Sequence, residues 1–270
     1  MGTELNRSVQ EFEVNGNALN VAALHRDGSR APIVFLHGFG STKEDYADIA
    51  LHREFNDRPV LAYDAPGCGE TMCADLAKIS IPLLVDTAVQ MLDRTGIEKF
   101  HLAGHSMGGL TALMLADKHP ERVLSFTDIE GNIAPEDCFL SRQIVDYAHS
   151  DPKLFLDAFI QRTSRLPAFA CALFAASLRH KVREDAVKPI FTSMVELSDH
   201  GDLMQKFLGL PCPKMFMHGD QNASLTYLDH IAANGVHLSE IPDCGHFPMY
   251  SNPTTMWQEI TDFIDMELSK

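Results

Sequence analysis

The sequence predicts an α/β protein with a doubly wound, mostly parallel sheet. Short apolar runs alternate with helical patterns along most of the 270-residue chain. Strands that are buried on both faces of a parallel sheet are apolar in this way. The alternation of strand and helix implies that helices cover the sheet on both sides. The predicted strands are residues 33–36, 60–63, 100–103, 123–129, 215–217 and 236–241.

Two helical patterns are especially clear. In the first, apolar residues recur on one face, and Gly96 follows where the helix should stop. In the second, Asn252-Pro253 supplies an N-cap and a proline at the first helical position of the last helix. The apolar faces comprise Leu84, Val85, Ala88, Met91 and Leu92 in the first helix, and Met256, Ile260, Phe263 and Ile264 in the second.

One stretch interrupts the alternation. Residues 132–211 contain no convincing strand but several helical patterns, and the stretch is too long for an ordinary loop. We therefore expect a sheet core formed by residues 1–131 and 212–270, with residues 132–211 inserted as a helical lid. A few of the large apolar residues of the lid should contact substrate, and the rest should pack the lid onto the core. These residues are Phe155, Phe159, Phe169, Phe174, Phe191 and Met194.

Composition and net charge argue against several classes of binding partner. The net charge is −15 and no cluster of Lys and Arg is present, which argues against nucleic acids and anionic membranes. No apolar run reaches the length of about 18 residues that a membrane span needs. The polar residues 1–10 lack the apolar core of a secretion signal, so a cytoplasmic location is expected. The sequence has no HExxH, GxGxxG or P-loop motif, and neither a metal nor another cofactor is expected.

The candidate nucleophile is Ser106. Gly104-His105-Ser106-Met107-Gly108 forms a G-x-S-x-G motif between a predicted strand and a strongly helical segment. This strand–turn–helix setting is what a nucleophile elbow requires, because the glycines permit a tight turn that exposes the serine hydroxyl. The N-terminus of the following helix would direct free N–H groups at a developing oxyanion.

An oxyanion hole requires two main-chain donors. One comes from the residue after the nucleophile, and the other from an earlier loop that follows a strand. His37-Gly38-Phe39-Gly40 follows the strand at residues 33–36. We assign the two donors to the N–H groups of Phe39 and Met107.

The candidate base is His246. It lies in Pro242-Asp243-Cys244-Gly245-His246-Phe247-Pro248, directly after the last predicted strand and before the final helix. A base on this loop lies at the carboxyl edge of the sheet, where it can reach the nucleophile. Among the 13 histidines, His246 is the one that combines a loop after a predicted strand with the position in the chain order that a triad base requires.

Four motifs in this order resemble the α/β-hydrolase superfamily, in its carboxylesterase-like branch. They are the HGFG, Asp64–Gly69, GHSMGG and GHFP segments, and the resemblance covers nearly the whole chain outside the predicted lid. It implies the α/β-hydrolase fold and a serine hydrolase mechanism. In such proteins the segment at Asp64–Gly69 is mainly a structural turn, and we give it no catalytic role.

The acid of the triad departs from the common pattern of that superfamily. The usual position, on the loop after His218-Gly219, holds Asn222, and an amide cannot stabilise an imidazolium with a charge. Glu130 ends the strand at residues 123–129. Its placement looks like that of the acid in haloalkane dehalogenases and zearalenone lactonases. We assign the acid to Glu130, with Asp128 and Asp220 as rivals.

The expected function is hydrolysis of small to medium apolar esters or lactones through an acyl-enzyme on Ser106. A serine nucleophile argues against epoxide hydrolase and dehalogenase chemistry. Carbon–carbon bond hydrolysis, acyl transfer to another alcohol, and a hydrolase-like ligand receptor with little turnover remain alternatives. The expected partner is a small-molecule ester. The sequence leaves open whether the chain forms a homo-oligomer.

Overall fold

A computed structural model describes residues 4–144, 147 and 151–268 of the chain. Its main feature is a nine-stranded sheet in the order β1-β2-β4-β3-β6-β7-β8-β9, with β5 paired to β2. The strands from β4 to β9 along this order run parallel, whereas β1 and β5 pair antiparallel with β2, and β2 pairs antiparallel with β4. The strands are β1 (Asn6–Val14), β2 (Asn17–Arg26), β3 (Ile33–Leu36), β4 (Val60–Tyr63), β5 (Met72–Cys73), β6 (Phe100–His105), β7 (Val123–Ile129), β8 (Lys214–Gly219) and β9 (His237–Ile241).

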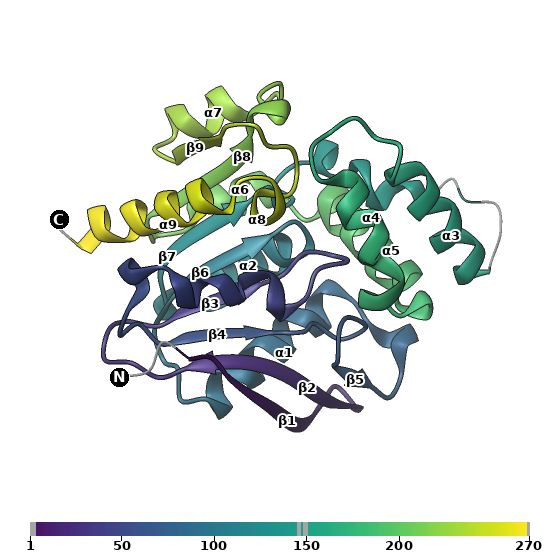
Figure 1. The fold of residues 1–270 in the computed structure, drawn as a ribbon, viewed down its shortest axis with the longest axis horizontal. Helices are drawn as coiled ribbons and strands as arrows, with labels where there is room; N and C mark the ends of the chain where they lie inside the picture. Colours follow the sequence, from purple (N-terminus) through teal and green to yellow (C-terminus); the bar gives the residue numbers. More distant parts are fainter. Residues whose placement is uncertain (1–3, 145–146, 148–150, 269–270) are drawn as a thin grey trace.

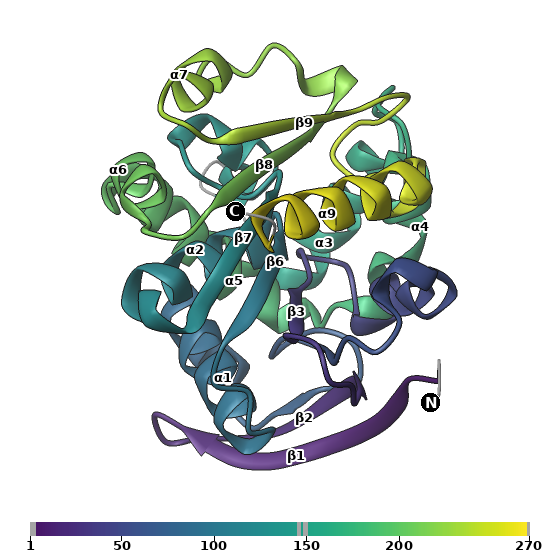
Figure 2. The ribbon, with the colours of Figure 1, turned by 90° about the vertical axis from the view of Figure 1, so that its left-hand side faces the viewer.

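Helices cover both faces of this sheet, as the alternating pattern predicts. Figure 2 shows α1, α2 and α6 on one side and α9 on the other. On the α9 side, Trp257 packs edge-on against Phe35 of β3 and Phe55, at centroid distances of 5.4 and 5.5 Å. The helices are α1 (Ile81–Arg94), α2 (Met107–Lys118), α3 (Pro152–Thr163), α4 (Cys171–Lys181), α5 (Glu184–His200), α6 (Leu203–Gly209), α7 (Leu228–Ala233), α8 (Pro248–Ser251) and α9 (Pro253–Leu268), with a 3-10 segment η1 (Lys43–Leu51).

The sheet begins earlier than the predicted strands do. The first predicted strand starts at Ile33, whereas β1 and β2 form a hairpin of two long strands before it. Asn15 and Gly16 join them with positive φ angles of 51° and 73°. Asn-Gly between two alternating segments is a strong hairpin signal, so the sequence does contain the information for this turn. The half-exposed β1 mixes polar and apolar residues, which hides it from a search for apolar runs.

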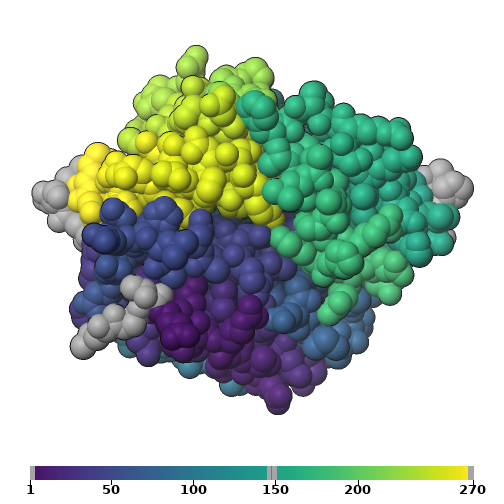
Figure 3. Space-filling view, viewed as in Figure 1, coloured from purple at the N-terminus to yellow at the C-terminus, as the bar shows by residue number. Residues whose placement is uncertain are grey.

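Between β7 and β8 the described residues form helices α3 to α6 and short 3-10 turns. Figure 1 shows α3, α4 and α5 grouped at one end of the sheet, and in Figure 3 the same part of the chain forms a contiguous lobe. Helix α6 lies apart from them and packs beside α2 on a face of the sheet. The segment expected as a lid, residues 132–211, therefore includes α6, which belongs to the helices that cover the sheet.

The helical lobe is attached to the core between α4 and α5. Val182 forms an antiparallel bridge with Cys68. On either side of it, the Gly69 N–H donates to the Lys181 carbonyl at 2.8 Å, and the Arg183 N–H donates to the Gly67 carbonyl at 2.9 Å. The turn at Asp64–Gly69 thus has a structural role, because it supplies the main chain to which the lobe is joined.

Candidate active site

Ser106 lies at the sharp turn between β6 and α2. Its backbone has φ 51° and ψ −117°, a conformation that non-glycine residues rarely adopt. The turn packs closely against β3, since a Cβ atom on Gly108 would lie 2.0 Å from the Leu36 carbonyl oxygen. A Cβ atom on Gly104 would lie 2.4 Å from the Gly108 oxygen. The motif therefore needs glycine at both positions so that the turn can form.

His246 and Glu130 meet at the carboxyl ends of β7 and β9. The Nδ1 atom of His246 lies 2.7 Å from Oε2 of Glu130. Both residues are buried, with 7% and 6% of their surface exposed. A carboxylate accepts, so Nδ1 carries the proton, and Nε2 of the neutral ring is left as an acceptor. This is the tautomer that a general base requires.

The Glu130 carboxylate has further donors. The Gly219 N–H donates to Oε1 at 2.8 Å. The side-chain amide of Asn222 donates to Oε1 at 2.9 Å and to Oε2 at 2.7 Å. Glu130 itself has a φ of 47°, a strained conformation that turns the chain away from β7. The carboxylate is therefore held in one orientation by main-chain and side-chain donors as well as by the imidazole.

The two rival acids contact other groups. Asp220 accepts from the N–H groups of Asp243 and Cys244, both at 2.9 Å, and these hydrogen bonds, that from Cys244 foremost, lower its pKa. Asp128 is fully buried, accepts from the Gly131 N–H at 2.8 Å, and has its pKa raised well above the usual value by burial. In the described residues neither carboxylate contacts His246.

The two candidate oxyanion donors are buried main-chain groups. Met107 is the first residue of α2, where the N–H groups of a helix have no internal acceptor. Phe39 lies on the loop after β3, and its ring packs against Phe191 at 4.4 Å. Within the described part of the chain, neither N–H donates to a protein acceptor. Both are therefore available to a ligand oxygen.

Two histidines without a predicted site role, His37 and His105, pack at the loop after β3. His37 Nε2 accepts from the Ala65 N–H at 2.9 Å and its Nδ1 donates to the Gly38 carbonyl at 2.8 Å. His105 Nε2 donates to the His246 carbonyl at 2.7 Å, and a Cβ atom on Gly38 would lie 2.5 Å from its Nδ1. Burial lowers the pKa of both rings, that of His105 well below the usual value. The only sequence signal for them is their position inside the two motifs.

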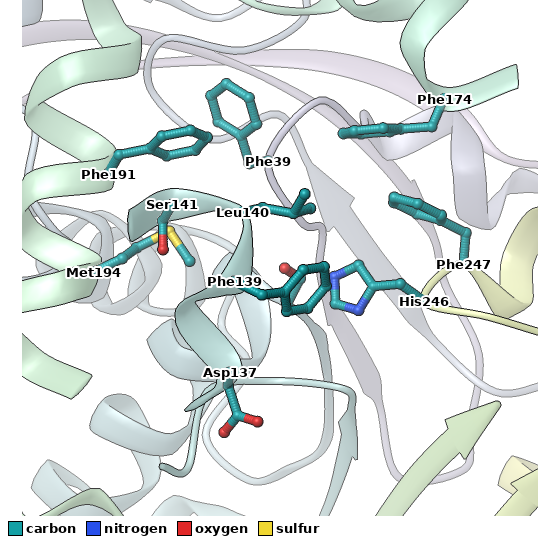
Figure 4. A pocket seen from close by; sticks show the side chains of 11 residues that line it. Phe39, Asp137, Phe139, Leu140, Ser141, Phe174, Phe191, Met194, His246 and Phe247 are labelled. Atoms are coloured by element: carbon teal, nitrogen blue, oxygen red, sulfur yellow. The ribbon is translucent and has the colours of Figure 1, made fainter. Parts of the chain in front are cut away.

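Ser106 and His246 line one small cavity of about 20 Å³. Figure 4 shows its wall, which is mainly aromatic. Three of the large apolar residues predicted for the lid line the cavity, namely Phe174, Phe191 and Met194. Phe155 and Phe159 pack behind the cavity wall, against Phe191. Phe169 is 46% exposed. A second part of the wall escaped prediction, because the segment before α3 shows no helical pattern. It consists of Asp137, Phe139, Leu140 and Ser141.

Comparison with known proteins places the fold in a family. Residues 33–258 match the alpha/beta hydrolase family. The chain belongs to this family. Its fold matches that of a carboxylesterase from Nitrososphaera gargenis, with a TM-score of 0.76 over 96% of this chain and 99% of that chain, at 16% identity. At that identity the likeness concerns the fold alone.

Several curated relatives of this alpha/beta hydrolase match it over less than half of its length. A dihydrolipoyllysine-residue acetyltransferase component of the acetoin cleaving system from Pseudomonas putida is 39% identical over 120 residues, which are 44% of this chain and 31% of that protein. A 2-hydroxymuconate semialdehyde hydrolase from Pseudomonas sp. is 36% identical over 102 residues, or 37% and 36% of the two chains. The matches span about a third of the length of the first of these relatives.

Two other kinds of site are absent from the described residues. No group of three or more His, Cys, Asp and Glu side chains there is arranged to hold a metal ion. No helix among them combines the length and the apolar character of a membrane span.

Proposed function

We propose that this α/β hydrolase is a serine carboxylesterase acting on small to medium apolar esters or lactones. The observation that carries the proposal is the 2.7 Å hydrogen bond between His246 and Glu130, beside a cavity that Ser106 also lines. A nucleophile, a base in the correct tautomer and a buried carboxylate form the set that acyl transfer requires.

The proposed reaction has two steps. His246 Nε2 takes the hydroxyl proton as Ser106 Oγ attacks the ester carbonyl. The N–H groups of Phe39 and Met107 stabilise the oxyanion, and His246 returns the proton to the departing alcohol. Water then attacks the acyl-enzyme by the same route and releases the acid and Ser106.

Glu130 has an electrostatic role in this proposal. It keeps the proton on Nδ1 and stabilises the imidazolium that forms in each step. Asn222 orients the carboxylate and does not take part in proton transfer. The triad acid thus comes from the end of β7, and the position on the loop after β8 supplies an amide that holds it.

We further propose that the helical lobe is a lid that selects substrates. Phe174 comes from α4, and Phe191 and Met194 come from α5, so the lobe supplies one wall of the cavity. Apolar pockets with few polar groups favour apolar acyl chains. Release of product would require the lobe and the segment at residues 135–144 to move apart.

Carbon–carbon bond hydrolysis is the second candidate function. It is favoured by the similarity of 102 residues to a 2-hydroxymuconate semialdehyde hydrolase. The same serine, base and oxyanion hole serve either reaction. A ligand receptor would keep the site with little turnover. Turnover of p-nitrophenyl esters, compared with release of acid from a vinylogous 1,5-diketone, separates these three functions.

The decisive experiment uses a fluorophosphonate probe. We expect the mass of the probe on the peptide that contains Ser106, and loss of both labelling and esterase activity in Ser106→Ala. Ser164→Ala, a substitution at an exposed serine at the end of α3, is the matched control and should label as the wild type does. Labelling at a different serine would refute the assignment.

A further inference from the structure

Within the described residues, a second side-chain hydroxyl besides that of Ser106 lines the cavity and makes no hydrogen bond. Ser141 begins a short 3-10 turn (Ser141–Ile144), lines the cavity and is only 2% exposed. Its Oγ atom makes no hydrogen bond to any described residue. Burial of a hydroxyl without a partner costs free energy that a hydrogen bond from a ligand would recover.

The other polar groups of the cavity wall are already engaged. Ser106 and His246 belong to the proposed reaction. Asp137 accepts from the Tyr227 hydroxyl at 2.7 Å through Oδ1, and from the N–H groups of Ile133 and Ala134 at 2.8 Å through Oδ2. Among the described residues of the wall, Ser141 therefore presents a hydroxyl that neither the proposed reaction nor another residue engages.

Ser141 and His246 lie on different sides of the cavity wall. Figure 4 shows Ser141 on the side of the cavity with Met194 and Phe191, whereas His246 lies on the opposite side. A substrate group that reaches Ser141 is therefore not the scissile carbonyl, whose oxygen faces the Phe39 and Met107 amides in the proposed reaction.

The charge of the cavity restricts that group. Asp137 is an acidic member of the wall, and no Lys or Arg is among the described residues that line it. A carboxylate on the substrate would meet no opposite charge and would be repelled. A neutral group that hydrogen-bonds with a hydroxyl fits instead.

We propose that Ser141 recognises a ketone group on the substrate, away from the scissile bond. This inference rests on the proposed esterase function and names its substrate class, esters of oxo-substituted chains. A site built around a hydroxyl discriminates against an analogue without the matching group, because the hydroxyl is then left buried and unpaired.

The test compares matched esters. In the acyl arm, p-nitrophenyl hexanoate is compared with oxohexanoates that carry the ketone at the third, fourth or fifth carbon. In the alcohol arm, pentyl acetate is compared with oxopentyl acetates in a pH-stat. We expect kcat/KM to rise about tenfold for the ketone at one chain position.

Ser141→Ala should abolish this preference, and it should raise kcat/KM for the plain ester because a buried unpaired hydroxyl is removed. Ser141→Thr keeps the hydroxyl and should keep the preference. Ser198→Ala is the control, since Ser198 Oγ accepts from Asn132 at 3.2 Å and does not line the cavity. Absence of a ketone preference in both arms, or its survival in Ser141→Ala, would overturn the inference.

Calorimetry separates this inference from the proposed function. The same ester pairs are titrated into Ser106→Ala and into the Ser106→Ala/Ser141→Ala double variant. If the wild type hydrolyses none of the esters, the esterase proposal fails, and the ratio of the two dissociation constants still decides the role of Ser141. Thermal melting of each variant checks that it is folded.

Discussion

The side-chain amide of Asn222 donates to both carboxylate oxygens of Glu130, at 2.9 and 2.7 Å. The two residues come from the ends of neighbouring parallel strands, β8 and β7, so their side chains meet at one edge of the sheet. The proposed acid therefore lies at the end of β7, and the position after β8 that usually holds the acid carries the amide of Asn222.

Loss of the Glu130 charge should strongly lower kcat. Glu130→Gln removes the carboxylate that fixes the tautomer of His246 and stabilises its charged form, and kcat should fall by about 10⁴. Steady-state kinetics on a p-nitrophenyl ester measures this effect, with thermal melting as the check on folding.

The comparison for Glu130→Gln is Asp220→Asn. Asp220 holds the main chain of Asp243 and Cys244 and does not contact His246. Its loss should lower the melting temperature but leave kcat within about tenfold of the wild type, a deficit of about 1.4 kcal/mol. The opposite ranking of these two variants would show that the acid is misassigned.

Asn222→Asp should have opposite effects in two backgrounds. In the wild type it places two carboxylates in contact, and the repulsion raises the pKa of one of them, so the rate at neutral pH should fall. In Glu130→Gln it restores one carboxylate beside His246 and should recover part of the lost kcat. Kinetics of the two single variants and the double variant form a double-mutant cycle, and strictly additive losses would contradict the shared site.

Met194 should limit the length of the acyl chain. It lines the cavity from α5, so Met194→Ala should move the optimum to acyl chains about two carbons longer, at a cost in stability of about 2 kcal/mol or more. A series of p-nitrophenyl esters gives the profile of kcat/KM against chain length. Phe169→Ala, in the same lobe but half exposed, should leave that profile unchanged.

Buried His101 should make the protein sensitive to acid. Burial, with smaller contributions from Arg58 and Arg30, lowers its pKa to about 4. The unfolded chain takes up the proton near pH 6.5, so the stability that neutral His101 contributes is present above that pH and is lost as the pH falls towards 4. Between pH 7 and pH 5 the loss from this residue is about 2 kcal/mol.

Urea unfolding of His101→Gln measures that contribution. Between pH 7 and pH 5 the free energy of unfolding of the variant should fall by about 2 kcal/mol less than that of the wild type. At pH 7 the variant should be less stable than the wild type, because the hydrogen bond to Ser125 changes. His230→Gln, at an exposed position on α7, is the control and should follow the wild type. Parallel pH profiles for His101→Gln and the wild type would contradict the assignment.

Local chemistry along the chain accounts for the parts of this protein that could be predicted from its residues. The apolar runs predict the inner strands, because a strand covered on both faces excludes polar side chains. The glycines around Ser106 predict a tight turn, and the Cβ distances at Gly104 and Gly108 explain why no other residue fits. The hairpin at Asn15-Gly16 was equally within reach of local reasoning.

Contacts between distant residues depend on how the strands and helices are arranged in space. Glu130 and His246 are 116 positions apart, and their contact depends on the order β6-β7-β8-β9 in the sheet. The same order brings Asn222 to Glu130 and leaves Asp220 to hold the main chain of the loop before His246. Ser141 became part of the cavity for a similar reason, because its segment is folded back over Ser106 by packing against α5. Contacts of this kind arise from strand order and helix packing, which no local pattern of residues encodes.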